Sequence, residues 1–151
     1  MAMEEPQHSG GLNAALEAAR RRFPEARELV VLPADLPLAL PQEIRQLAEA
    51  AATDPVLVLV PSADGGTNAL ALSPPGLIPF RFGPDSARRH EDEARRLGVR
   101  PLRLSLPSLG LDVDTPADLD LVATLRERCR PRTAAALDLL RPATAGSPER
   151  G

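Results

Sequence analysis

Polar stretches that could bind a metal ion and phosphates follow three apolar runs in this sequence of 151 residues. A carboxylate follows the first run, a glycine-rich loop the second, and two further carboxylates the third. Carboxylates hold Mg²⁺, which in turn holds phosphates, and glycines let backbone amides approach a second anion. The set suits metal-assisted phosphoryl or nucleotidyl transfer: Asp35, residues 65–68, Asp112 and Asp114, with the Gly83 amide and the Ser86 hydroxyl at a helix start.

Asp35 has two interpretations. The four apolar residues 29–32 predict a buried strand, and Pro33 and Pro37 prevent that strand from continuing. Ligands of open α/β sheets bind beyond the carboxyl ends of the strands, which favours Asp35 as a Mg²⁺ ligand. The alternative is that Asp35 only caps the turn and the helix that follows. Spacing alone does not separate the two roles.

The composition excludes several classes of function. All eighteen basic residues are arginine, so the chain has no lysine for a Schiff base or a phosphate loop. A net charge of −3 and only three aromatic residues argue against nucleic acid as a partner. The single cysteine, Cys129, cannot form an intrachain disulfide. No run has membrane-spanning length and no secretory signal opens the chain, so we expect a cytoplasmic protein.

Alternating helices and strands are expected to position the polar residues. The apolar runs 29–32 and 56–60, with a helix between them, predict a right-handed βαβ unit in a buried parallel sheet. A short strand over 68–73 and a half-exposed or edge strand over 101–106 follow. Because no linker divides the chain, we expect a single α/β domain over residues 1–141 and a disordered tail over 142–151.

Helix signals are found throughout the chain. Gly10-Gly11 either starts the first helix or lets a nucleotide approach the backbone, and that helix has an apolar face made of Leu12, Leu16, Ala19 and Phe23. Pro41 suits the first turn of the second helix, and mixed charge indicates a solvated face on the third. Thr115-Pro116-x-Asp118 is a capped helix start. The later helices are expected over about 40–53, 85–97, 115–128 and 133–140.

Five motifs in a fixed order resemble those of one enzyme family. They are Gly11-Leu12-Asn13-x-Ala15-Leu16, Leu32-Pro33-Ala34-Asp35-Leu36-Pro37, Gly66-Thr67-Asn68-x-Leu70, Phe82-Gly83-Pro84-x-Ser86 and Leu111-Asp112-Val113-Asp114-Thr115-Pro116-x-Asp118-Leu119. Together they resemble the 2-phospho-L-lactate/phosphoenolpyruvate guanylyltransferases, which act in the biosynthesis of the deazaflavin coenzyme F(420). The resemblance spans about residues 10–125. It implies a Rossmann-like nucleotidyltransferase fold of the nucleotide-diphospho-sugar transferase type, with a mostly parallel sheet.

The resemblance also implies roles for individual residues. Asp35 would be catalytic as a Mg²⁺ ligand beneath the GTP phosphates, with Asp112 or Asp114 as the second ligand. Asp112 is preferred, because Asp114 also suits a role beside the helix cap at Thr115. The remaining matches are Thr67, Gly83 and Ser86 in the phospho-acid site, and Gly11 and Asn13 near the guanosine.

The implied reaction joins GMP from GTP to a phospho-acid and releases pyrophosphate. The acceptor would be phosphoenolpyruvate or 2-phospho-L-lactate. The sequence does not choose between them, although a GC-rich bacterial source, suggested by the arginine bias, would favour phosphoenolpyruvate. Two alternatives remain: another sugar or cofactor nucleotidyltransferase, and a non-catalytic chain that acts only through protein contacts.

One departure from the family concerns the amino-terminal side. Family members begin with an additional βαβ portion that carries the first strand and a basic phosphate loop, whereas only 28 residues precede Leu29 here. We therefore expect the domain to be N-terminally incomplete, with an exposed sheet edge that could pair two copies into a homodimer. His90 and Cys129 are interpreted as structural or surface residues. His90, one helical turn after Ser86, could also lie near a substrate phosphate.

Overall fold

The computed structural model describes residues 11–140, so the tail expected over 142–151 lies outside the described residues. Within 11–140, no helix is long and apolar enough to cross a membrane. The elements in chain order are α1 (Gly11–Arg20), β1 (Leu29–Val31), α2 (Pro41–Ala50), β2 (Val56–Pro61), β3 (Thr67–Ser73), α3 (Ser86–Arg96), β4 (Leu102–Arg103), α4 (Pro116–Thr124), the 3₁₀ helix η1 (Arg126–Arg128) and α5 (Pro131–Leu140).

The strands form one sheet in the order β1-β3-β2-β4. β3 pairs antiparallel with both β1 and β2, whereas β2 and β4 pair in parallel. β1, β2 and β4 therefore run in one direction, as expected of a mostly parallel sheet, but the sheet is mixed, because both pairs that include β3 are antiparallel. β1 and β2 are parallel as the βαβ pattern predicts, but β3 lies between them, and the sequence did not indicate the reversed direction of β3.

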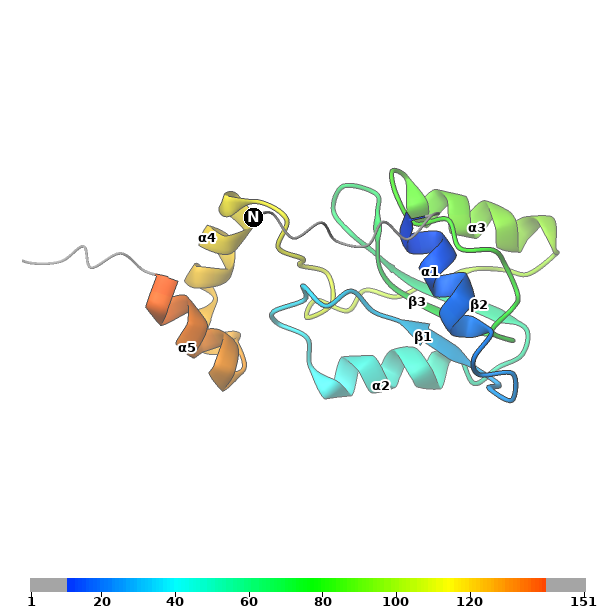
Figure 1. Ribbon diagram of the computed structural model, residues 1–151, viewed down its shortest axis with the longest axis horizontal. Helices are drawn as coiled ribbons and strands as arrows, with labels where there is room; N and C mark the ends of the chain where they lie inside the picture. Colours follow the sequence, from blue (N-terminus) through cyan, green and yellow to red (C-terminus); the bar gives the residue numbers. More distant parts are fainter. Residues whose placement is uncertain (1–10, 141–151) are drawn as a thin grey trace, which may run out of the picture.

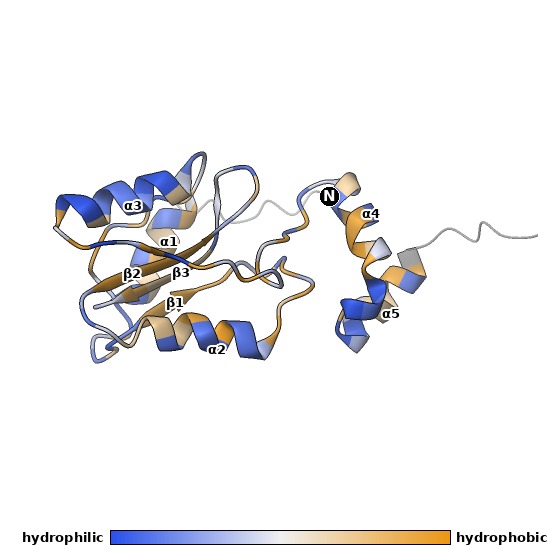
Figure 2. Ribbon diagram, turned by 180° about the vertical axis from the view of Figure 1, so that it is seen from behind, coloured by the Kyte–Doolittle hydropathy of each residue, from blue (hydrophilic) through white to orange (hydrophobic). Residues whose placement is uncertain are grey.

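Helices cover both faces of the sheet (Figure 1). Side chains alternate along each strand, so Val58 and Val60 pack towards α2 while Leu57 and Leu59 pack towards α1 and α3. The strands form the apolar centre of this sandwich, and the exposed side of α3 is hydrophilic (Figure 2). Leucine, valine and alanine fill most of the interior, as the scarcity of aromatic residues requires.

The burial predicted for β1 is only partly observed. All three of its residues are half-buried, because among the described strands β1 pairs with β3 alone and its other edge is unpaired. β2 and β3 have neighbours on both sides and are buried along most of their length. β4 is the other edge strand, as its alternating sequence predicts, but it covers only two residues.

The prediction that the first helix buries an apolar face was wrong. Leu12 and Phe23 are 60% and 65% exposed, and Leu16 alone of the predicted face packs against the core. The helix instead turns polar side chains towards the segment 75–82 and forms hydrogen bonds with main-chain amides and carbonyls of that segment. The contacts are Asn13 to Phe82, Glu17 to the Phe80 amide, and Arg20 to the carbonyls of Pro75 and Ile78.

The last two helices lie beside the sheet rather than on one of its faces (Figure 1). The helix expected over 115–128 ends at Thr124 and continues as η1, and α5 packs against η1. Arg126 and Asp138 form an ion pair between these two elements. The expectation of a single domain over 1–141 stays a prediction.

Candidate functional site

Three polar segments leave the sheet at the same edge. Because β1, β2 and β4 point in one direction, the segment after β1, the β2–β3 loop and the chain after β4 all begin at their carboxyl ends (Figure 1). The site residues predicted on these segments therefore lie at one edge of the sheet. In open α/β sheets this is the edge where ligands bind.

The β2–β3 loop is closed by hydrogen bonds of its own. The Ser62 amide donates to the Gly66 carbonyl over 3.1 Å, and the Asp64 carboxylate accepts from the Gly66 amide over 3.0 Å and from the Ser62 hydroxyl. The Ser62 hydroxyl and the Gly66 amide lower the pKa of Asp64. A tight loop of this kind fixes the place where β3 begins, and thereby fixes Thr67.

The predicted phospho-acid residues come together where this loop meets the start of α3. The Ser86 hydroxyl donates to the Thr67 hydroxyl oxygen over 3.0 Å, and the Ser86 amide donates to the Gly83 carbonyl over 3.1 Å. The Ala87 amide donates to the Gly65 carbonyl over 3.2 Å, which joins the loop to the helix. Gly83 has a φ of +122°, a backbone conformation that favours glycine. We call this junction of 65–67 and 83–86 the cradle.

His90 contacts the cradle through Thr67 and is completely buried, so the surface interpretation was wrong and the structural one is confirmed. Its Nδ1 lies 3.2 Å from the Thr67 hydroxyl oxygen, and its Nε2 accepts from the Arg81 amide over 2.9 Å. The ring of Phe82 contacts it edge-on, with the ring centroids 5.0 Å apart. Burial, together with the positive charges of Arg89 and Arg81, lowers the pKa of His90 to about 4.

Sequence reasoning missed two further groups here. The guanidinium of Arg89 lies at the cradle, with Nη1 3.9 Å from the point where a Cβ on Gly83 would stand. Arg81, Arg88 and Arg96 each pair with an acidic residue, whereas no ion pair of Arg89 is found within residues 11–140. The sequence pattern of α3 was interpreted as a solvated face, so Arg89 was not identified as a candidate site residue. The other group is the buried amide nitrogen of Asn68, next to Thr67, which has no hydrogen-bond partner among the described residues.

Asp35 is exposed, and its side chain accepts no hydrogen bond in the part of the chain that the structure describes. The cap residue of α2 is Leu40, which has no side-chain cap of its own. The Ser108 hydroxyl oxygen instead accepts from the Leu40 amide over 3.1 Å. The capping interpretation of Asp35 was therefore wrong, and its carboxylate is available to a ligand.

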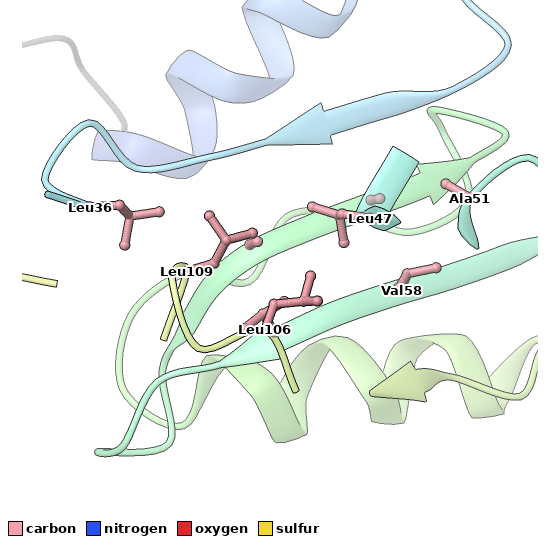
Figure 3. Close-up of a cluster of buried hydrophobic side chains, with 9 residues drawn as sticks. Leu36, Leu47, Ala51, Val58, Leu106 and Leu109 are labelled. Atoms are coloured by element: carbon pink, nitrogen blue, oxygen red, sulfur yellow. The ribbon is translucent and has the colours of Figure 1, made fainter. Parts of the chain in front are cut away.

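The segments that carry Asp35 and Asp112 are anchored in the same core. Leu36 and Leu109 are buried in the cluster beneath α2, together with Leu106 (Figure 3). The Glu43 carboxylate adds polar contacts, because it accepts from the Ser108 amide over 2.8 Å and from the Ser108 hydroxyl over 2.6 Å. Ser108 thus joins the start of α2 to the chain after β4.

Asp114 lies close enough to both Asp112 and Asp35 for the charges to interact. The pKa of Asp114 is raised, chiefly by the negative charge of Asp112 and further by that of Asp35. The cap of α4 is formed by Thr115 and Asp118 and takes only the main-chain amide of Asp114, not its carboxylate. The reason for preferring Asp112 over Asp114 as a metal ligand is therefore removed.

These carboxylates fit a hard divalent cation, because a positive charge would relieve their mutual repulsion. No group of three or more His, Cys, Asp or Glu side chains that could hold a metal ion is found among residues 11–140. A cation at this edge would therefore take one or two carboxylates from the chain and its other ligands from water or phosphates, as Mg²⁺ commonly does.

A cavity of about 450 Å³ lies between α1 and the segment after β1. It is lined by Leu12, Leu16 and Phe82 and by residues 31–35, which include Asp35. Asn13 does not line this cavity. Its side chain is held at Phe82, donating to the carbonyl over 3.0 Å and accepting from the amide over 2.8 Å. Gly11 begins α1 with a φ of +66°.

Comparison with known proteins gives matches over most of the chain. Residues 3–125 match the family model described as "Guanylyl transferase CofC like". A phosphoenolpyruvate guanylyltransferase of Rubrobacter xylanophilus is 47% identical over 132 residues, which are 85% of this chain and 64% of that protein. One from Chloroflexus aurantiacus is 44% identical, covering 72% and 54%. A 3-phospho-D-glycerate guanylyltransferase of Colwellia psychrerythraea is 37% identical, covering 76% and 56%.

The fold is also shared with a solved structure. A crystal structure from Desulfovibrio desulfuricans G20, described as a nucleotide-diphospho-sugar transferase, superposes with a TM-score of 0.63 at 23% identity. The match covers 85% of this chain and 56% of that one, and it confirms the expected fold type. This chain spans between 54% and 64% of the length of the three relatives named above.

Proposed function

We propose, on the premise that this chain belongs to the guanylyl transferase CofC-like family, that it takes part in transfer of GMP from GTP to a small phosphorylated carboxylic acid. The observation that carries the proposal is the meeting of two different sites at one sheet edge. The cradle of Thr67, Gly83 and Ser86 offers hydroxyl and amide groups to an anion. The carboxylates of Asp35 and Asp112 offer ligands to a cation.

The charges of the side chains indicate which residues would bind the metal ion and which would bind the acceptor. Asp35, together with Asp112 or Asp114, would hold Mg²⁺, which when bound supplies positive charge to the GTP phosphates. Thr67 and Ser86 would bind the phosphate or carboxylate of the acceptor through their hydroxyl groups. The guanidinium of Arg89 is a further donor beside these residues. An acceptor that carries several negative charges requires at least one such cation.

In the proposed reaction, an oxygen of the acceptor phosphate attacks the α-phosphorus of GTP in line with the leaving group. A bond forms between that oxygen and the α-phosphorus. The bond from the α-phosphorus to the bridging oxygen of the β-phosphate breaks, and pyrophosphate leaves with the bonding electron pair. No covalent intermediate with the chain is needed, which agrees with the absence of lysine from the sequence. The chain's own residues orient the two phosphates.

Phosphoenolpyruvate and 2-phospho-L-lactate are the proposed acceptors, and the product would enter the biosynthesis of coenzyme F(420). The names of the relatives from Rubrobacter xylanophilus and Chloroflexus aurantiacus support phosphoenolpyruvate. The relative named for 3-phospho-D-glycerate supports a second candidate acceptor of the same chemical class. All three acids combine a phosphate with a carboxylate, which is what a cradle of donors and one guanidinium can bind.

The nucleotide is proposed to occupy the cavity between α1 and Asp35, with Gly11 and Asn13 near the guanosine. Asn13 would act there through the main chain of Phe82, which it holds in place. Competition binding with GTP, UTP, CTP and ATP distinguishes this proposal from another sugar or cofactor nucleotidyltransferase. GTP is expected to compete best.

The role of Asp35 is tested by Asp35→Asn, which removes the charge and keeps the shape of the side chain. Pyrophosphate release from GTP and Mg²⁺ is expected to fall by about a hundredfold or more, because charge stabilisation in the transition state is lost. Asp54→Asn is the matched control, since Asp54 is exposed and precedes β2 at the opposite edge of the sheet. Equal activity in the two variants would contradict the assigned role.

A further inference from the structure

The hydroxyl groups of Thr67 and Ser86 share two protons, and their hydrogen bonds decide how many remain for a ligand. One proton is used in the contact between the two hydroxyl groups. Whether the second is free depends on the contact between the Thr67 hydroxyl and His90 Nδ1. If Nδ1 is unprotonated, the Thr67 hydroxyl must donate to it, and both protons are used. If Nδ1 carries a proton, the Thr67 oxygen accepts, and one hydroxyl proton stays free.

The main chain decides between these two cases. The Arg81 amide donates to His90 Nε2 over 2.9 Å, so Nε2 must present its lone pair. A neutral imidazole with a lone pair on Nε2 carries its proton on Nδ1. Nδ1–H therefore donates to the Thr67 oxygen, which is already an acceptor for the Ser86 hydroxyl. Thr67 is left with a hydroxyl proton that has no acceptor within the described residues.

We propose that His90 is a positioning residue that makes the Thr67–Ser86 hydroxyl pair a donor to the anionic acceptor. The inference rests on the proposed function, because it takes the acceptor to be bound in the cradle. Thr67 is 7% exposed and Ser86 only 1%, so Thr67 is the hydroxyl that can reach a ligand. His90 itself is sealed in the interior and does not touch the ligand.

The surroundings of His90 keep this arrangement in place. Burial and the charges of Arg89 and Arg81 hold its pKa near 4 against the opposing effect of Glu93, so the ring is neutral at physiological pH. Phe82 fixes the plane of the ring by its edge-on contact. A neutral ring with one fixed tautomer is the form that the proton count requires.

Two variants of similar polarity separate positioning from packing. In His90→Asn, an amide NH₂ can take the place of Nδ1–H and still donate to Thr67. In His90→Gln, the longer side chain can reach the Arg81 amide with its carbonyl but no longer donates to Thr67. We expect His90→Gln to weaken binding of phosphoenolpyruvate and 2-phospho-L-lactate by about tenfold to a hundredfold in calorimetry. Without a donor at the Nδ1 position, the Thr67 hydroxyl can turn its proton to the Ser86 oxygen, and its hydrogen bond to the charged ligand is lost. His90→Asn is expected to stay near the wild type.

The outcomes distinguish this inference from the proposed function. Nitrogen-15 chemical shifts of the ring should show the proton on Nδ1, whatever the chain binds, and a proton on Nε2 would overturn the inference alone. Equal affinities of His90→Gln and His90→Asn in a chain whose wild type binds the acids would also overturn it alone. A wild type that binds neither acid would overturn both. In a Thr67→Val background, His90→Gln should cause no further loss, since the two residues act through one hydroxyl group.

Discussion

At the scale of single residues, the cradle stands out because buried polar side chains are costly unless they are bonded. Thr67, Ser86 and His90 are all buried, and each bonds to another member of the group or to the main chain. The network therefore removes the cost of burying three polar groups and leaves one hydroxyl proton for a ligand. Asn68 is the exception, because its buried amide nitrogen has no partner among the described residues.

The buried His90 makes stability depend on pH in a defined direction. Its pKa is about 4 in the folded chain and near 6.5 when exposed, so between these values the unfolded chain binds more protons. The contribution of a neutral His90 is complete above about pH 6.5 and is lost as the pH falls towards 4. We expect the wild type to lose about 3 kcal/mol of unfolding free energy over this window relative to His90→Gln.

Denaturant unfolding of both proteins at pH 7, 6, 5 and 4 measures this difference. The carboxylates titrate in both proteins, so subtracting one profile from the other isolates His90. Parallel profiles would show that His90 has no shifted pKa, and would remove the evidence that its ring is neutral.

At the scale of elements, the site depends on how α2 is joined to the chain after β4. Ser108 accepts from the Leu40 amide and donates twice to Glu43, and it is 2% exposed. Ser108 therefore caps the start of α2 from a distant part of the chain. These bonds also hold the segment of Asp35 against the segment of Asp112.

We expect Ser108→Ala to lower the free energy of unfolding by about 1–3 kcal/mol, because it removes the hydroxyl that accepts from the Leu40 amide and donates to Glu43. The main-chain amide of residue 108 still donates to Glu43 in this variant. Ser105→Ala is the matched control, since Ser105 is exposed on the same segment and makes no hydrogen bond through its side chain within residues 11–140. Chemical denaturation of both variants gives the comparison. Equal stability of the two would show that this connection does not hold the segments together.

Sequence patterns predicted elements better than they predicted how elements face each other. Continuous apolar runs identified β2, and the cap signal at Thr115 identified the start of α4, because both depend on local preferences. The exposed face of α1 could not be predicted, because it depends on unpaired main-chain groups of the segment 75–82. The position of β3 between β1 and β2 also depends on tertiary pairing.

The same limit applies to the candidate site. The motif residues Thr67, Gly83 and Ser86 were identified from their sequence, and the structure brings them together. Arg89 and the hydrogen-bonding role of His90 were missed, because each depends on which side of α3 faces the cradle. The capping interpretation of Asp35 failed because Ser108, far along the chain, serves that helix instead. The metal ligands and nucleotide contacts stay predictions.

At the scale of the whole molecule, one sheet edge brings together parts that are far apart in the chain. The carboxylates and the cradle lie on separate segments of the chain between residues 35 and 114, and the parallel directions of β1, β2 and β4 bring these segments to the same edge (Figure 1). β1 is an outer strand of the sheet, and among the described residues its outer side has no paired strand. The homodimer expected to form through this unpaired strand stays a prediction. The central claim is that this edge transfers GMP to a phospho-acid.

Pyrophosphate release by the purified 151-residue chain tests that claim most directly. The chain would be supplied with GTP, Mg²⁺ and, in separate reactions, phosphoenolpyruvate, 2-phospho-L-lactate or 3-phospho-D-glycerate, with a downstream reaction to consume the product. We predict release that requires GTP and one of the acids, which would also identify the acceptor. A folded chain that releases no pyrophosphate with any of the three acids, or releases it equally without them, would contradict the account.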